Sequence, residues 1–142
     1  MVVHMLKSKL HRARVTDANV DYEGSMTIDH DLMDEVGILP YERILCTNAT
    51  TGTRFETYAI PGERGAGDII LNGAAAHLGA PGDRITIMSF TELDAVVARS
   101  WKPRIVVLGE DNRVVDSRSP LKTTSVIRNW AFESEKSPDT FH

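Results

Sequence analysis

Short segments with the composition of β-strands recur along most of this chain, and this recurrence limits the folds that it can adopt. Six segments are rich in β-branched residues or alternate between apolar and polar residues, namely 9–15, 42–49, 54–60, 68–72, 83–90 and 104–109. Turn-forming stretches rich in Gly, Pro and Thr separate them, at 50–53, 61–67 and 79–83. The pattern predicts an all-β, β-rich fold, and we expect a barrel.

Few segments have the signals of a helix. The clearest is 29–37, where Asp29 can cap the N-terminus and Gly37 can close the C-terminus. Apolar residues within this segment share one helical face, namely Leu32, Met33 and Val36. Shorter helical turns are expected at 72–77 and 91–100, so the predicted barrel carries a few short helices.

Composition narrows the class of protein. The chain has 142 residues, of which 42% are hydrophobic and 25% are charged, as expected of one globular domain. A formal net charge of −4 gives no overall basic field, so we expect neither a nucleic acid nor a membrane as partner. The single cysteine, Cys46, excludes an internal disulfide and lacks zinc-type spacing to histidines, so no metal site is predicted.

The ends of the chain suggest a location and a boundary. The N-terminal apolar run is too short for a signal peptide, and no run approaches the ~18 residues of a membrane span, so we expect a cytoplasmic protein. The segment 117–142 is rich in Ser, Thr, Pro and charge, with Trp130 and Phe132 as its only large anchors. We therefore predict a folded domain over 1–116 and a poorly ordered tail over 117–142.

A Gly-Ser pair stands in the middle of the strand-like stretch 21–29, with the sequence DYEGSMTID. Glycine weakens a strand and marks a bulge or a close approach to the backbone. The following serine, Ser25, is either ordinary or the reacting residue.

Strand alternation sorts the polar residues of two segments by face. Lys9 and His11 share one face of the first strand, and Arg54, Glu56 and Tyr58 share one face of the strand near residue 55. Cations on strands are most often solvated or protect an edge. Alone, this grouping does not define a site.

Three blocks give the chain a resemblance to a known family. The stretches KLHRARVTDANVDYEGSMTID (9–29), RFETYAIPGERGAG (54–67) and NGAAAHLGAPGD (72–83) resemble aspartate 1-decarboxylase, a pyruvoyl-dependent family that makes β-alanine for pantothenate. Their order and spacing match, and the likeness runs from about Met5 to Val115. The resemblance implies a lyase that decarboxylates L-aspartate to β-alanine and CO2.

The resemblance also gives the Gly-Ser pair a role, because the family cuts its own chain there. It implies that Ser25 Oγ attacks the carbonyl of Gly24, and that the resulting ester breaks by β-elimination. The dehydroalanine left at position 25 then hydrolyses to a covalently bound pyruvoyl group and ammonia. This cofactor forms a Schiff base with the substrate amine and accepts the electrons left by CO2.

The remaining site residues are carried over from the family. Tyr58 is the implied proton donor to the carbanion. The implied substrate-binding residues are Lys9, Arg54, Thr57, Gly73, Ala74 and Ala75, and the implied supporting residues are His11, Tyr22 and Asn72. Alternation points Thr57 opposite to Tyr58, so a twist or bulge must reconcile the two, or one assignment is wrong.

The implied fold is a double-psi β-barrel, assembled as a homotetramer with active sites between subunits. A maturation factor is a possible further partner, since the residues do not reveal whether cleavage is spontaneous. Two alternatives stay open: an uncleaved β-barrel interaction module, and a pyruvoyl decarboxylase of another small amino acid. The paired cations Lys9 and Arg54 argue against the second, since a monocarboxylate would leave one charge unmatched.

Overall fold

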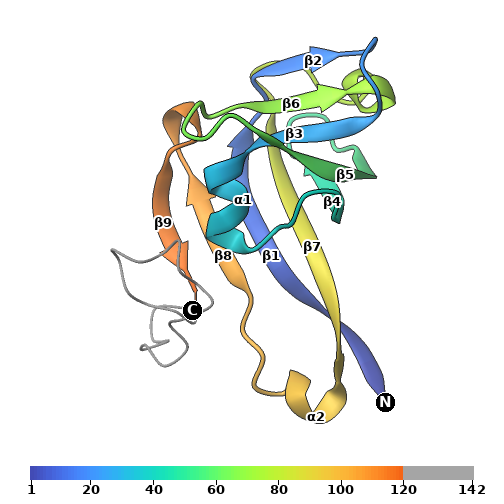
Figure 1. The fold of residues 1–142 in the computed structure, drawn as a ribbon, viewed down its shortest axis with the longest axis vertical. Coiled ribbons are helices and arrows are strands. Elements are labelled where there is room, and N and C mark those ends of the chain that lie inside the picture. The colour runs from blue at the N-terminus through green and yellow to red at the C-terminus, as the bar shows by residue number, and fades with distance from the viewer. Residues whose placement is uncertain (120–142) are drawn as a thin grey trace.

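The fold is a strand-rich barrel in a computed structural model that describes residues 1–119 (Figure 1). Its nine strands form one sheet in the order β2-β6-β3-β5-β4-β7-β1-β8-β9. The strands are β1 (Val2–Arg14), β2 (Asp17–Asn19), β3 (Ser25–Asp29), β4 (Arg43–Asn48), β5 (Arg54–Gly62), β6 (Ile69–Asn72), β7 (Arg84–Asp94), β8 (Arg104–Leu108) and β9 (Val114–Arg118). The all-β fold class predicted from the sequence is confirmed.

Strands that are distant in sequence pair in parallel. β1 pairs with β8, β2 with β6, and β3 with β5, while the other neighbours run antiparallel. These three crossed connections agree with the double-psi barrel that the resemblance implies. β1 and β7 are the longest strands, and they extend together beyond the rest of the barrel toward the N-terminus (Figure 1).

One face of each long strand fills the core. The buried hydrophobic side chains include Leu10, Met26, Ile44, Cys46, Ala59, Leu71, Ile85, Ile87 and Val106. Residues that alternate with them along β1, β4, β5 and β7 are half-buried or exposed. The sheet therefore has an apolar inner face and a polar outer face.

The predicted helix at 29–37 is α1 (His30–Val36). The carboxylate of Asp29 accepts a hydrogen bond from Asp31 N, and Gly37 ends the helix in the left-handed region at φ 79°. Both predicted caps are confirmed, and the apolar face packs into the core. The turn at 72–77 is the 3₁₀ helix η1 (Gly73–His77).

The helix expected at 91–100 is shorter than predicted. β7 continues to Asp94 because residues 91–94 pair with the start of β1, and α2 covers only Ala95–Ala98. A second 3₁₀ turn, η2 (Glu110–Asn112), joins β8 to β9. β9 itself was not predicted.

Several other boundaries differ from the sequence-based expectations. β1 begins at Val2 rather than at residue 9, because residues 2–6 pair with β7. The Gly-Ser pair does not lie within a strand, because β3 starts at Ser25 and Gly24 belongs to the preceding bend. β9 extends to Arg118, two residues into the predicted tail, because its residues pair with β8. The rest of that tail, from 120 onward, lies outside the described residues.

Candidate active site

Ser25 is a buried hydroxyl at the first position of β3. Its relative exposure is 1%, although Gly24 before it is exposed. Ser25 Oγ accepts a hydrogen bond from Asn72 Nδ2 at 3.0 Å and donates to Glu23 O at 3.4 Å. The antiparallel register sets Ser25 directly opposite Asn72 on the neighbouring strand. The strand pairing therefore places the Asn72 amide beside the Ser25 hydroxyl.

The amide of Asn72 serves two hydroxyls on the same face of β3. Besides Ser25, it donates to Thr27 Oγ1 at 3.0 Å. Asn72 is itself 3% exposed, so this arrangement is held away from water. Thr27 was missed from the sequence, although its position two residues after Ser25 places it on the same strand face.

Tyr58 extends this group. Met26 pairs with Ala59 in the parallel β3–β5 ladder, and Ser25 and Tyr58 are the residues that immediately precede this pair. Thr27 and Ile60 pair next, so Ser25, Thr27 and Tyr58 lie on one face of the two strands. The Tyr58 ring is 36% exposed and lies 6.3 Å, centroid to centroid, from the ring of Tyr41. We call Ser25, Thr27, Tyr58 and Asn72 the serine cluster.

A second group lies on the same outer face, across β5, β4, β7 and β1. The register aligns Arg54 with Thr47, and Thr47 with Thr86. Thr86 Oγ1 lies 3.4 Å from His11 Nδ1, and Lys9 precedes His11 by two residues on the same face of β1. We call Lys9, His11, Thr47, Arg54 and Thr86 the cation cluster.

The two clusters are far apart within one chain. In the sheet order Lys9 lies four strands from Ser25, a path of about 19 Å along the curved sheet at a strand spacing of ~4.8 Å. Arg54 precedes Tyr58 by four residues along β5, about 13 Å at ~3.3 Å per residue. The register thus places Lys9, Arg54 and Tyr58 on the outer face, whereas Thr57 lies on the other face of β5. It does not set Lys9 or Arg54 beside Ser25 of the same chain.

The surroundings of His11 lower the pKa of its imidazole. Its pKa is lowered by burial, and further by the positive charges of Lys9, Arg12 and Arg118. The imidazole is therefore neutral at pH 7, so it can accept a proton or a hydrogen bond. By contrast, burial raises the pKa of the Cys46 thiol to about 12, which removes it as a nucleophile.

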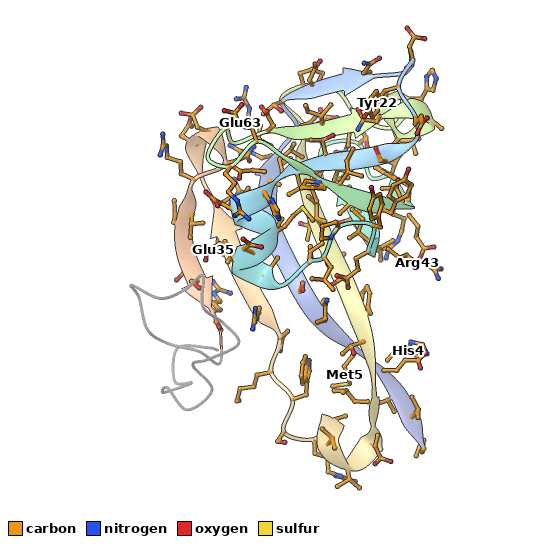
Figure 2. The ribbon with its side chains drawn as sticks, in the orientation of Figure 1. His4, Met5, Tyr22, Glu35, Arg43 and Glu63 are labelled. Atoms are coloured by element: carbon orange, nitrogen blue, oxygen red, sulfur yellow. The ribbon has the colours of Figure 1, made fainter. Side chains whose placement is uncertain are left out.

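The segment before Ser25 packs against the start of η1. Gly73 is buried with φ 69°, and a Cβ built on it would lie 2.7 Å from Gly24 Cα and 3.1 Å from Tyr22 O. Figure 2 shows Tyr22 at this end of the barrel. The residue is 51% exposed. The three residues that follow Asn72 are Gly73, Ala74 and Ala75, so they lie next to the serine cluster in the chain. Ala74 is exposed and Ala75 is buried.

Thr57 lies on the opposite face of β5 from Tyr58. The β4–β5 ladder runs without a register shift from Arg54 to Tyr58, so neither a bulge nor an irregularity turns Thr57 outward. Its side chain is half-buried, on the face that also carries Phe55 and Ala59. A substrate contact by Thr57 stays a prediction from the resemblance.

Gly24 takes part in a close backbone approach, as its place in the sequence indicated, but its own side-chain position is open. A Cβ added to Gly24 would meet no atom within 4 Å beyond its chain neighbours, and its φ is not in the left-handed region. The steric demand for glycine at this contact falls on Gly73 instead.

Two neighbours of the predicted residues gave no local sequence signal. Thr86 contacts His11 across 75 residues of sequence, and Tyr41 reaches Tyr58 from the loop after α1. The β1–β7 pairing reveals the first contact, and the fold of the loop before β4 reveals the second. Tyr41 also has φ 72°, which is rare for a bulky residue.

The described residues lack two other kinds of feature. Within 1–119, no group of three or more His, Cys, Asp or Glu side chains is arranged to hold a metal ion. None of the helices over the same residues has the length and apolar content that a membrane crossing requires.

Comparison with known proteins gives consistent matches over the barrel. A sequence profile of the family "Aspartate decarboxylase" matches residues 1–115. Aspartate 1-decarboxylase of Myxococcus xanthus is 49% identical over 115 residues, which cover 81% of this chain and 88% of that protein. The enzyme of the same name from Legionella pneumophila is 52% identical over 114 residues, or 80% and 86% of the two chains. The one from Acetivibrio thermocellus is 47% identical over 122 residues, or 86% and 97%.

Proposed function

The chain belongs to the aspartate decarboxylase family, and from this we infer that it converts L-aspartate to β-alanine and CO2 for the synthesis of pantothenate and coenzyme A. It is a carboxy-lyase. The observation that carries the inference for this chain is the Ser25 hydroxyl, buried and held by Asn72 next to an exposed Gly24. A buried, oriented hydroxyl beside an accessible peptide suits a residue that reacts with its own backbone.

The enzyme is made as a single-chain zymogen that cleaves itself between Gly24 and Ser25. Ser25 Oγ attacks the Gly24 carbonyl carbon, and the acyl group moves from nitrogen to oxygen. Loss of the Ser25 Cα proton and cleavage of the Cβ–Oγ bond release a chain that ends at the Gly24 carboxylate. Water then displaces ammonia from the dehydroalanine, which leaves a pyruvoyl group at position 25.

The surroundings of Ser25 fit such a group. Asn72 and Thr27 provide an amide donor and a hydroxyl beside position 25, and no metal or second nucleophile is needed there. The pyruvoyl ketone supplies an electrophilic carbonyl that binds the substrate amine and accepts the electrons left when CO2 departs. All other roles fall to side chains and backbone amides of this protein.

Tyr58 donates the proton that replaces CO2. A phenol hydroxyl can act as a general acid when it is positioned beside the reacting carbon. The position of Tyr58 on the same face as Ser25, with both residues directly before the Met26–Ala59 pair, supports this role. Asn72 orients Ser25, and Gly73, Ala74 and Ala75 face the bound substrate through their backbone amides. Tyr22 borders the site, and Thr57 contributes a contact that the resemblance alone supports.

Arg54 and Lys9 bind the two carboxylates of aspartate, with neutral His11 between them as a hydrogen-bonding group. Arg54 offers a planar fork that matches a carboxylate. Because both cations lie on the outer face and far from Ser25 of the same chain, they serve the serine cluster of a neighbouring copy. The active sites therefore lie between subunits, and we expect the homotetramer that the resemblance implies.

A side-by-side assay of amino acids tests the function. The purified protein should release CO2 and form β-alanine from L-aspartate, with at most slow turnover of L-glutamate, which carries the same charges on a longer side chain. If the protein decarboxylated a monocarboxylate amino acid faster than L-aspartate, that amino acid would be the substrate and the proposed function would be wrong. A cytoplasmic location is part of the same proposal.

A further inference from the structure

Gly73 makes an unusually close contact with the segment that precedes Ser25. A Cβ on Gly73 would lie 2.7 Å from Gly24 Cα, 2.9 Å from Gly24 N and 3.1 Å from Tyr22 O. Carbon atoms that are not bonded normally stay ~3.5–4.0 Å apart, so only a glycine permits this approach. The backbone at position 24 rests directly on the bare Cα of Gly73.

The two sides of this contact differ in how firmly they are held. Gly73 is buried and follows Asn72, which pairs with Asn19 on one side and with Ser25 on the other. Gly24 lies in an exposed bend between β2 and β3, and Val20 and Tyr22 before it are about half exposed. A side chain at position 73 would therefore displace the bend rather than the sheet.

Besides its 3.4 Å bond to Glu23 O in the bend, Ser25 is held from the sheet. Its hydroxyl is 1% exposed and is held by Asn72 Nδ2 at 3.0 Å within the β3–β6 ladder. A shift of the bend would thus move the Gly24 carbonyl relative to a hydroxyl that Asn72 holds from the sheet by the shorter of its two bonds. Reacting atoms must meet at about 3–3.5 Å, and a misplacement of about 1 Å can cost ~10²-fold in rate.

We propose that Gly73 is a positioning residue for self-cleavage, whose missing side chain lets Gly24 settle with its carbonyl within reach of Ser25 Oγ. This role rests on the proposed cleavage between Gly24 and Ser25, and differs from a substrate contact because it acts before the cofactor exists. It also explains why glycine is required at 73, while a Cβ at 24 would meet no obstacle.

The chain offers a matched control for the test. Gly52 has φ 84°, close to the 69° of Gly73, but a Cβ on Gly52 would meet nothing within 4 Å. Gly52→Ala and Gly73→Ala therefore share the strain of a left-handed backbone, and only Gly73→Ala adds the clash with Gly24. Intact mass under denaturing conditions, followed over time after synthesis, gives the cleaved fraction of each.

We expect Gly73→Ala to fold and to cleave ~100-fold or more slowly than the parent. Gly52→Ala should cleave at nearly the parental rate. Hydroxylamine cuts an ester at position 25 and so reports the acyl shift alone. It should not restore cleavage in Gly73→Ala, because the shift itself is blocked. Thermal unfolding monitored by circular dichroism, in a Ser25→Ala background, checks that both variants are folded.

Several outcomes would overturn the role of Gly73. Equal cleavage of Gly73→Ala and parent would show that the contact does not position the peptide, and equal slowing of both variants would assign the effect to backbone strain. If hydroxylamine restored cleavage, the acyl shift would be intact in Gly73→Ala, and Gly73 would act only on the later elimination step. If Gly73→Ala does not fold, Gly73→Asn and Gly52→Asn repeat the comparison, since Asn tolerates positive φ. A Gly73→Asn variant that is also unfolded would make Gly73 a residue of the barrel only.

Failure of the proposed function would look different. In that case the parent protein itself would remain one uncut chain, whatever residue stands at 73. If the parent protein cleaves normally, slow cleavage of Gly73→Ala can be attributed to the substitution at position 73.

Discussion

At the residue scale, the proton transfer proposed for Tyr58 is the most specific chemical role. Tyr58→Phe keeps the ring and its contact with Tyr41, but removes the proton that the proposal has the phenol donate. General acid catalysis by a positioned group contributes ~10²–10⁴-fold. We expect kcat to fall by that amount in steady-state assays of β-alanine formation, while intact mass shows complete cleavage at Gly24-Ser25.

The matched control for this variant is Tyr41→Phe, which retains both rings and the Tyr58 phenol. It should keep nearly the parental kcat. If Tyr58→Phe turns over as fast as the parent protein, water or another residue delivers the proton, and Tyr58 leaves the list of catalytic residues.

His11 makes the stability of the folded protein depend on pH. Its pKa in the folded state is lowered, by burial first and then by Lys9, Arg12 and Arg118, whereas in the unfolded chain it stays near ~6.5. Between these two values the unfolded chain binds more protons, so the free energy of unfolding falls as the pH falls through this window. Above ~6.5 the contribution of His11 is complete.

Denaturant unfolding at pH values from 7.5 down to 5 measures this effect. We expect His11→Gln to lose less stability than the parent over that range, because glutamine does not titrate. An identical pH slope in both proteins, or an NMR titration of His11 at or above its ordinary pKa, would refute the assignment.

At the element scale, η2 ties together two segments that lie far apart in the sequence. Asn112 is 3% exposed, and its side chain acts like a strand partner of Arg14. Its Oδ1 accepts from Arg14 N at 2.7 Å, and its Nδ2 donates to Arg14 O at 2.9 Å and to Gly67 O at 2.8 Å. Gly67 N in turn donates to the Asp29 carboxylate that caps α1.

Asn112→Asp should therefore destabilise the barrel strongly. It removes the two donated bonds and sets a carboxylate against two carbonyl oxygens, which we expect to cost about 3 kcal/mol or more. Denaturant unfolding compares it with Asp111→Asn, an exposed neighbour with the same left-handed backbone, which should stay within about 0.5 kcal/mol of the parent. Similar losses in both variants would show that backbone strain in η2, rather than these bonds, matters.

Local signals in the sequence were sufficient for some elements. Asp29 and Gly37 mark the ends of α1 because capping depends on residues next to the helix. The β4–β5 hairpin follows its Thr-rich turn, where Gly52 takes φ 84°. β2 has three residues, too few to show a period, and β9 alternates too weakly among charged residues to be recognised.

The candidate site was predictable only in part. Alternation placed Arg54 with Tyr58, and Lys9 with His11, because it concerns one strand at a time. The parallel pairing of β3 with β5 and the distance between the two clusters depend on long-range topology, which periodicity does not contain. For the same reason the contact of Gly73 with Gly24 could not be predicted, since 48 intervening residues separate them in the sequence.

At the scale of the whole molecule, the separation of the two clusters predicts complementation between subunits. Lys9→Ala and Tyr58→Phe should each be nearly inactive alone. When the two chains are produced together and assemble at random, about a quarter of the inter-subunit sites combine an intact Lys9 with an intact Tyr58. We expect activity to recover to about that fraction of the parent.

The control is the double variant Lys9→Ala/Tyr58→Phe produced with either single variant, since no site can then contain both intact residues. Size-exclusion chromatography with light scattering verifies that mixed oligomers form. No recovery in verified mixed oligomers would mean that one chain supplies both residues, against the ~19 Å separation along its sheet.

The intact mass of the denatured, active protein tests the central claim most directly. The claim predicts two chains: one of residues 1–24 with a free carboxylate at Gly24, and one that begins at position 25 with a pyruvoyl group in place of serine. Ser25→Ala should give one uncut and inactive chain, because alanine has no oxygen with which to attack. A preparation that decarboxylates aspartate and yet contains only the uncut chain of 142 residues would contradict the account.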